Sequence, residues 1–549
     1  MENSSGQRTA TEEPEKLHQE DFQREADSVP EKLRLLKSTG GNAFPSEDDD
    51  EDDEVASADE GAYYTVADAL DRIGVGRFHY KLLVVVSIIS VAGGLGSTGF
   101  ALFPPLARCH LGLRSIHEAF LTSAPLVGAA IGGVALGYVA TRWGRRTELI
   151  IMMVWTSFFG FLSAAAPTYW WLITLRVLVG FGHGGTGQRL SILFEYLPKK
   201  DRTLGAGVLT FCWNIGNFLE AVLIKFLIPT GVAWRLILIA DAFVFGIALL
   251  FFKWLPESCF YLMARGQRTE ALRLLTKAAT ENNKKLPIGT LVTADEKEKY
   301  MNKVVPQGYS ETRIFRRTSS PPPLRQSQKK SSPLRDLFRP LDMCVTTILL
   351  SVAWFALAVA VVGCAILTEE LLQMRQSLGT GCHSTFELVH GDVCEELGTT
   401  DYTPILLIFA AEFPALFLTY YSAGILGRRK ALALSYALSA IFFGLLIICP
   451  LSSAWMTAFL AGARMSVTTA FSLMIIYTPE VYPTSVRGMA VGASRALYRL
   501  GSAGVPFLSQ VLLRKSVVGS KAVHTAVTLT AAFICLLLPI ETRNRQLGE

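Results

Sequence analysis

Motifs for covalent or nucleotide-driven chemistry are missing from this sequence. It has no Walker-type phosphate loop, no cysteines and histidines at zinc-site spacing, and no nucleophile elbow. Gly182, Gly184 and Gly187 spell G-x-G-x-x-G, but they lie inside an apolar run and not at a strand-to-helix turn. We therefore expect neither an enzyme nor an ATP-driven machine, and no cofactor, metal or nucleic-acid partner.

Charge is also scarce. Charged residues make up 18% of the 549 positions and hydrophobic residues 50%, an excess too large for one soluble core. Apolar runs of about 20 residues, the length of a helix that crosses hydrocarbon, recur along the chain. We predict an all-α membrane protein with twelve transmembrane helices in two six-helix bundles. The expected spans are 81–105, 118–140, 147–166, 171–193, 204–228 and 233–254, then 341–367, 402–422, 430–450, 453–477, 486–511 and 519–540.

No cleavable secretory signal precedes the first apolar run, because the residues before it are strongly polar. The acidic run Glu47 to Glu54 and the shortage of aromatics favour a disordered cytoplasmic tail there. The predicted organisation is a tail (1–78), a first bundle (79–255), a cytoplasmic linker loop (256–340), a second bundle (341–540) with a luminal or extracellular loop (369–401), and a cytoplasmic tail (541–549).

Lys and Arg in the short loops fall mostly on one side of the expected spans, which the positive-inside rule assigns to the cytoplasm. Both termini are then cytoplasmic, in the plasma membrane or in a secretory or synaptic-type vesicle membrane. Arg514, Lys515 and Lys521 disagree, since they would face outward.

Cysteines are few, and most lie in apolar runs as small buried side chains. Cys382 and Cys394 lie together in the predicted outer loop, where a disulfide is chemically allowed. Cys109 is a competing partner, and free thiols are the alternative.

The two halves repeat the same polar signatures in the same order. Gly144-Arg145-Arg146 matches Gly427-Arg428-Arg429, and Arg176 matches Arg464. The segment from Glu195 to Arg202 matches Glu480 to Arg487, and Pro256-Glu257-Ser258 matches Pro539 through Glu541-Thr542. Duplicated bundles of this kind can rock against each other around a central site, so that a solute passes without a continuous pore.

At these residues the chain resembles the major facilitator superfamily, in the group of sugar porters and organic ion transporters. Gly137 through Arg146 is similar to the motif between spans two and three, and Tyr477 through Gly488 resembles a signature of that group. Val66 to Leu70 with Ile73 to Phe78 is similar to the branch of synaptic vesicle two-related proteins. The resemblance implies a secondary transporter of a small organic solute, working by alternating access.

Three departures from the family pattern favour an alternative. Thr141 replaces an expected Asp, Gly424 and Ile425 replace an acidic and basic pair, and the first span reads Ala92-Gly93-Gly94-Leu95 where vesicle-related members carry acids. The alternative is a transporter-like vesicle membrane protein with a binding or regulatory role and no coupled transport.

The resemblance also implies an inner gate, in which Arg145 pairs with Glu195 and Arg428 with Glu480. The solvated loops of a positive-inside protein are the competing interpretation. The predicted gating residues are Arg142, Gly144, Arg145, Arg146, Glu195, Arg202, Gly427, Arg428, Arg429, Glu480 and Arg487.

Charges inside spans are informative, because each costs roughly 2.5–3.5 kcal/mol unless it meets water or a partner. We expect Lys225 to reach the membrane surface and Asp241 to be a structural partner. Arg495 and Arg499 are four apart, hence on one helix face, and with Arg189 they suit a carboxylate. A neutralised Arg and Glu network without a substrate role is the alternative. The resemblance to the vesicle-related branch places Glu220, Glu412 and Arg499 near the central cavity. The predicted substrate-binding residues are Gln188, Arg189, Trp213, Asn217, Glu220, Glu412, Arg495 and Arg499.

The sequence thus predicts a transporter with a weak preference for an organic anion or zwitterion. Its expected partners are the small-molecule substrate, a coupling ion that is a proton or sodium, and the lipid bilayer.

Overall fold

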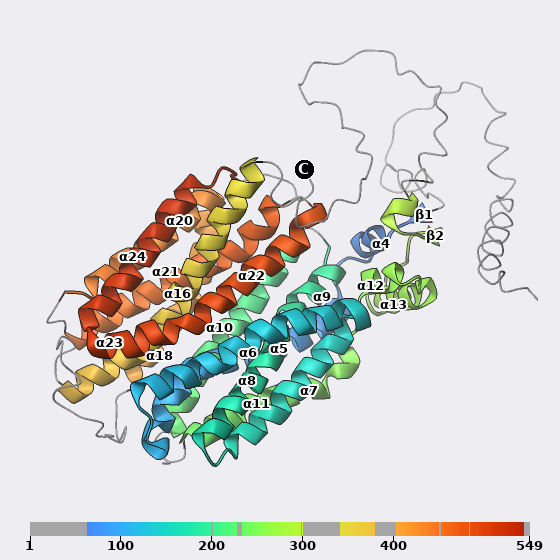
Figure 1. Cartoon of the computed structure of the whole chain (residues 1–549). Helices are drawn as coiled ribbons and strands as arrows, with labels where there is room; N and C mark the ends of the chain where they lie inside the picture. The colour runs from blue at the N-terminus through green and yellow to red at the C-terminus, as the bar shows by residue number, and fades with distance from the viewer. Residues whose placement is uncertain are drawn as a thin grey trace, which may run out of the picture. The chain divides into compact units, whose positions relative to one another are not determined.

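The first half of the chain forms one helical bundle in a computed structural model that describes residues 63–198, 201–227, 233–297, 299, 341–378, 402–448, 452–482 and 484–542. Its elements are α5 (Arg77–Leu111), α6 (Ser115–Trp143), α7 (Arg145–Ala164), α8 (Tyr169–His183), η1 (Gly184–Gly187), α9 (Gln188–Tyr196), α10 (Arg202–Leu227), α11 (Ala233–Leu250) and η4 (Phe252–Trp254). Figure 1 shows these helices in blue and green.

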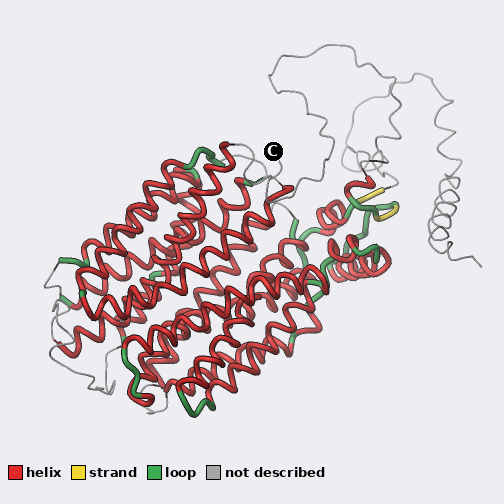
Figure 2. Tube along the Cα trace, viewed as in Figure 1, coloured by secondary structure: helices red, strands yellow, loops and turns green. Residues whose placement is uncertain are grey.

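The second half forms the second bundle, drawn from yellow to red in Figure 1. Its elements are α16 (Leu341–Leu378), α18 (Thr403–Ala410), α19 (Glu412–Leu426), α20 (Arg428–Leu445), α21 (Ser453–Val481), α22 (Thr484–Pro506), the π turn η5 (Phe507–Val511), α23 (Leu512–Lys515) and α24 (Val517–Leu537). Figure 2 shows that helix accounts for nearly all of both bundles.

Long helices or pairs of helices stand at all twelve expected span positions of the described chain. Eight of these segments are long and apolar enough to cross a membrane by length and composition alone. The other four are α8 with α9, which η1 interrupts, and α11, α20 and α22. The predicted all-α membrane fold is therefore confirmed.

Glycines bring α6 and α8 into backbone contact. A Cβ added to Gly132 would lie 1.8 Å from the carbonyl oxygen of Phe181, and one added to Gly180 would lie 2.0 Å from that of Pro125. No side chain fits at either position. Close packing through small residues is the usual way in which membrane helices associate, because lipid supplies no hydrophobic drive.

The buried apolar clusters show where the bundles meet. We call the end that carries Gly144 and Gly427 the motif end, and the end near Gly112 and Ser516 the opposite end. At the motif end, one cluster contains only residues of the first half and another only residues of the second. At the opposite end and at mid-depth, two clusters contain residues of both halves. The described side chains therefore join the bundles away from the motif end.

A small module at the motif end is built from two segments of the chain, one before the first bundle and one after it. Strand β1 (Tyr63–Tyr64) pairs in parallel with β2 (Thr290–Leu291), and α4 (Val66–Ile73), α12 (Cys259–Ala264) and α13 (Arg268–Glu281) complete it. Figure 1 shows these elements together beside the end of the bundle. The expectation of a disordered tail up to residue 78, followed later by a plain linker loop, is therefore wrong for these segments.

Asp68 stabilises this module through short-range hydrogen bonds. Thr65 and Asp68 form a capping box at the start of α4, and Lys297 Nζ lies 2.8 Å from Asp68 Oδ2. Burial alone would raise the pKa of Asp68, but the hydrogen bonds from Lys297 and Thr65 lower it below its ordinary value of 3.8. The stabilisation is therefore present above that ordinary value and is lost as the pH falls through the lowered one.

Asn282 connects the module to the first membrane helix. Its side-chain nitrogen donates to the carbonyl of Gly74 at 3.0 Å, and its oxygen accepts the amide of Phe78 at 3.0 Å. We predict that Asn282→Ala lowers the local stability of residues 66–78 by about 1–3 kcal/mol, since it leaves both groups without this partner. Hydrogen exchange of the amides in 66–78 measures the effect. Exposed Lys284→Ala is the control, and equal exchange in both variants would contradict the role of Asn282.

Candidate functional site

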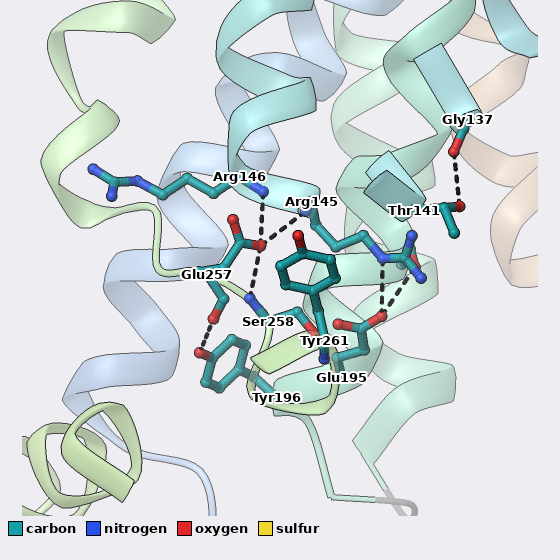
Figure 3. Close-up of polar contacts among 10 residues, drawn as sticks. Gly137, Thr141, Arg145, Arg146, Glu195, Tyr196, Glu257, Ser258 and Tyr261 are labelled. Atoms are coloured by element: carbon teal, nitrogen blue, oxygen red, sulfur yellow. Dashed lines mark hydrogen bonds and ion pairs between the residues drawn. The ribbon is translucent and has the colours of Figure 1, made fainter. Parts of the chain in front are cut away.

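Glu257 caps the start of α7 at the motif end (Figure 3). Its Oε1 accepts the backbone amides of Arg145 at 2.8 Å and Arg146 at 3.2 Å, which have no partner inside the helix. Gly144 has φ of 101°, and an added Cβ would lie 2.3 Å from Glu257 Oε2. Only glycine therefore allows this approach of the carboxylate.

The second half repeats this arrangement. Glu541 accepts the backbone amides of Arg428 at 2.9 Å and Arg429 at 3.3 Å, at the start of α20. Gly427 again has a positive φ, 82°, and an added Cβ would lie 3.0 Å from the carboxylate. Sequence reasoning noted Glu257 and Glu541 as repeat markers but missed this capping role. The feature of the sequence that could have indicated this role is that both glutamates follow the sixth span of their half.

Both ion pairs that the family resemblance implied are formed. Arg145 Nε lies 3.3 Å from Glu195 Oε1, and Arg428 Nε lies 3.4 Å from Glu480 Oε2. Each pair joins residues of one bundle, and Figure 3 shows the first of them beside Glu257. Their gating role stays a prediction.

The other predicted gating residues make mostly backbone contacts. The carbonyl of Arg142 accepts from Tyr261 at 2.9 Å and also from Arg265, while Arg202 donates to the carbonyl of Leu197 at 3.2 Å. Arg429 donates to the carbonyl of Leu536. The side chain of Arg487 and the predicted disulfide between Cys382 and Cys394 lie outside the described residues.

Gly144→Ala tests the capping geometry, and Gly137→Ala is its matched control. An added methyl at Gly144 meets Glu257 and a left-handed backbone, whereas nothing lies within 4 Å of a Cβ at Gly137. We expect Gly144→Ala to lower the stability of the purified protein by about 1–3 kcal/mol, and Gly137→Ala to raise or preserve it. Thermal unfolding in detergent compares them, and equal melting temperatures would refute the argument.

Arg189 lies at mid-depth in the first bundle, at the point where η1 ends. Its Nε donates to Ser90 Oγ at 2.8 Å, and it also donates to the carbonyl of Thr186. The guanidinium stacks on Trp213, 4.8 Å from the ring centroid. Gln188 precedes it and makes no side-chain hydrogen bond with the described residues.

Two arginines of α22 approach Arg189 from the second bundle. Arg499 donates to the carbonyls of Ala129 and, at 2.8 Å, Gly184, so it holds the two bundles together. Arg495 lies near Gly187, where an added Cβ would be 2.8 Å from its Nη1. Arg495 and Arg499 are the positive neighbours of Arg189. Within the described chain, Arg495 makes no hydrogen bond or ion pair, which leaves its five donors available.

Glu412 already has strong partners. Its carboxylate lies 2.6 Å from Arg464 in the same bundle and accepts from Asn217 of the first bundle at 2.8 Å. Asn214 donates to its backbone carbonyl at 3.2 Å. The structure therefore places Asn217 and Glu412 together in a contact between α10 and α19.

Glu220 points into the first bundle. An added Cβ on Gly99 would lie 2.9 Å from Glu220 Oε1 and 2.8 Å from Asp241 Oδ2, so three helices meet there. Arg176 is the nearest cation to this acidic pair. Neither oxygen of Asp241 has a hydrogen-bond partner among the described residues, and its structural role stays a prediction.

Sequence reasoning missed a buried ionic contact at the opposite end. Arg514 lies 3.0 Å from Glu118 of the first bundle and 3.4 Å from Glu370 of the second, and all three are at most 4% exposed. Lys521 is buried as well and donates to the carbonyl of Leu446 at 2.8 Å. These contacts explain why Arg514 and Lys521 violate the positive-inside pattern. That violation was the only feature of the sequence that pointed to the buried contacts.

Glu118→Gln should weaken the junction of the bundles at this end. Removing one partner of a buried ion pair typically costs roughly 3–5 kcal/mol, because the remaining charge stays buried. We expect a lower melting temperature and faster labelling of Thr122→Cys, which lies beside Gln510 at this interface, by a membrane-impermeant thiol reagent. Glu270→Gln, in the exposed pair with Arg273, is the control. Unchanged labelling and melting would show that the contact does not hold the bundles together.

Comparisons with known proteins agree with one another. The model of the Major Facilitator Superfamily matches residues 84–506. The synaptic vesicle 2-related protein of Xenopus laevis is 32% identical over 495 residues, covering 88% of this chain and 82% of that protein. The organic cation/carnitine transporter 7 of Arabidopsis thaliana is 30% identical over 500 residues, covering 90% and 97%.

Among solved structures, the xylose transporter XylE from E. coli in a partially occluded inward-open conformation has a similar fold. Its TM-score is 0.63 at 14% identity, covering 85% of this chain and 99% of XylE. At that identity the likeness concerns the fold alone.

Proposed function

The chain belongs to the Major Facilitator Superfamily, a family of transporters and not of enzymes, and from this premise we propose that it is a secondary transporter of a small organic solute. It is an integral multi-pass membrane protein. The preferred solute is an organic anion or a zwitterion. The solute moves by alternating access, through rocking of the bundles 79–255 and 341–540.

The guanidinium of Arg495, which has no partner among the described residues, is the observation that carries the preference for a carboxylate. Arg189 and Arg499 add positive charge beside it, from both bundles. The carboxylate of Glu412 is not available to this group, because Arg464 and Asn217 already occupy its oxygens. A carboxylate that binds between the bundles would receive two parallel hydrogen bonds from Arg495.

The arrangement of contacts supports an inward-facing state. The motif end, both termini and 256–340 belong on the cytoplasmic side in this proposal, in the plasma membrane or a secretory-type vesicle membrane. Among the described residues, the buried clusters then join the bundles on the outer side and at mid-depth, and the ion pairs of Arg145 and Arg428 each lie within one bundle. Rocking would break the Arg514 contact and bring the motif ends together.

The name of one relative fits a carboxylate-bearing solute. One relative is named as a transporter of organic cations and carnitine, and carnitine is a zwitterion with a carboxylate. A cationic centre in such a solute can rest against an aromatic ring such as Trp213.

Uptake into proteoliposomes tests the proposal with a panel of labelled organic anions, zwitterions, cations and neutral sugars, with and without a pH gradient. We expect saturable uptake of an anion or zwitterion. In Arg495→Gln the apparent affinity should fall roughly tenfold or more, since a charge-assisted contact is lost. Arg495→Lys keeps the positive charge but not the two parallel donors of the guanidinium, so its apparent affinity should lie between those of wild type and Arg495→Gln.

Two further variants complete the experiment. Arg499→Ala should lower both uptake and thermal stability, because Arg499 also holds two carbonyls of the first bundle. Exposed Arg273→Gln should behave as wild type. Uptake of only cations or sugars would overturn the carboxylate preference. No flux of any solute through a folded protein would favour a binding or regulatory vesicle protein without coupled transport.

A further inference from the structure

We propose that the solute is an organic dianion with two separate acidic groups, one bound by Arg189 of the first bundle and the other by Arg495 of the second. The inference rests on the proposed transport function and narrows the class of its solute. A dicarboxylate is the simplest solute of this kind, because both of its groups are ionised near neutral pH.

Two glycines of the first bundle make room for the arginines of α22. An added Cβ on Gly187 would lie 2.8 Å from Nη1 of Arg495, and one on Gly133 would lie 2.5 Å from Nη1 of Arg499. Arg189 follows shortly after Gly187 and has both of these arginines as its positive neighbours. Three guanidinium groups, contributed by both bundles, therefore gather around one turn of the first bundle.

No carboxylate of the described residues forms an ion pair with these three arginines. Glu412 is held by Arg464 at 2.6 Å. The other buried acids of the first bundle, beside Gly185 or beside Arg176, are Glu148, Glu220 and Asp241. An uncompensated charge at this depth is costly, so a cluster of three positive charges favours a ligand that carries more than one negative charge.

Two of the three guanidinium groups keep hydrogen-bond donors for a ligand. Among the described residues, Arg495 donates to none, and Arg189 uses only Nε and Nη1, which leaves its Nη2 without a partner. Both side chains are half-buried, so each keeps surface that a ligand can contact. Arg499 differs, because both of its terminal nitrogens already donate to carbonyls of the first bundle. Arg189 and Arg495 are therefore the two binding groups.

A ligand with a single negative charge suits this site less well. It would leave two guanidinium charges uncompensated, and a zwitterion would add a positive group of its own to the cluster. A dianion meets both available guanidinium groups through charge-assisted hydrogen bonds. The one remaining charge is that of Arg499, whose guanidinium two backbone carbonyls already solvate. Among anions and zwitterions, the site therefore favours a solute with two acidic groups.

The two ends of the site differ in rigidity. Arg189 is fixed by its hydrogen bond to Ser90 at 2.8 Å and by stacking on Trp213, with 4.8 Å between guanidinium and ring centroid. Arg495 has no hydrogen bond or ion pair within the described chain, so its long side chain can adjust its position. We therefore expect Arg189 to fix one acidic group and Arg495 to accept a range of distances to the second.

Thermal melting of the purified full-length protein tests the number of charges without any transport, because a bound ligand raises the melting temperature in a concentration-dependent way. The probes are a series of straight-chain dicarboxylates, the monoamide of each, inorganic phosphate and chloride. A monoamide keeps the shape of its parent and lacks one negative charge. We expect at least one dicarboxylate to bind roughly tenfold or more tightly than its monoamide, since the monoamide lacks one charge-assisted contact.

Variants assign the two acidic groups to the two arginines. In Arg495→Gln and, independently, in Arg189→Gln, the dicarboxylate and its monoamide should bind with similar affinity. Arg495→Gln carries the test even if Arg189→Gln fails to fold, because the side chain of Arg495 has no partner to lose among the described residues. Arg189→Lys keeps the charge and should keep the preference, and Arg273→Gln, in an exposed ion pair, should behave as wild type.

Three results would overturn the proposal. The first is equal affinity of wild type for the dicarboxylates and their monoamides, or no binding of any dicarboxylate in the series. The second is a preference for the dicarboxylate that persists in Arg495→Gln. The third is stabilisation by inorganic phosphate or chloride alone, which would make the cluster a site for a small inorganic anion.

The two proposals fail in distinguishable ways. If wild type transports nothing, yet binds a dicarboxylate with a preference that depends on Arg189 and Arg495, the transport function falls and the dianion site stands. If wild type transports a monocarboxylate or a zwitterion and binds no dicarboxylate more tightly than its monoamide, the function stands and the dianion site falls.

Discussion

The constraint on which this structure depends is that charge inside a membrane must find its partners within the protein. Most of the internal charges do so: Arg514 meets Glu118 and Glu370, and Glu412 meets Arg464. Such pairs fix the helices but have no capacity left for a ligand. The exceptions are therefore informative, because an unpaired charge at this depth costs several kcal/mol unless function retains it. Among the described residues Arg495 is such an exception, and so are the buried acids Glu220, Asp241 and Glu148.

The same constraint explains why the repeat is visible in the sequence. The third membrane helix of each half begins with backbone amides that have no partner inside the helix. A carboxylate that follows the sixth membrane helix of the same half accepts hydrogen bonds from them. The carboxylate fits only where the preceding residue is a glycine with positive φ. Gly144 and Glu257, like Gly427 and Glu541, are thus fixed by backbone geometry in both halves, and duplication preserved them together. That is why a comparison of the halves shows the same motifs in the same order, whereas the helices were predicted from the apolar runs and the ion pairs of Arg145 and Arg428 from the family resemblance.

Features that depend on packing between distant helices were not accessible in this way. On sequence grounds Arg514 was an exception to the positive-inside distribution of loop charges. Nothing in its local sequence shows that Glu118, 396 positions away, lies beside it. The pairing of Tyr63–Tyr64 with Thr290–Leu291 was missed for the same reason, since two-residue strands leave no periodic pattern. Composition suggested disorder for the whole tail, whereas contacts with the later module order its last part.

The missing acids of the first membrane helix have a packing explanation. A Cβ on Gly94 would lie 2.1 Å from the carbonyl oxygen of Trp213, so α5 and α10 touch through their backbones and no carboxylate fits there. Five residues further along, Gly99 leaves room that the carboxyl groups of Glu220 and Asp241 fill from the neighbouring helices. An acidic group therefore still contacts the first helix, although another helix supplies it. The absence that favoured an uncoupled protein on sequence grounds is thus compatible with coupling, because the position of a charge in space matters and not the helix that carries it.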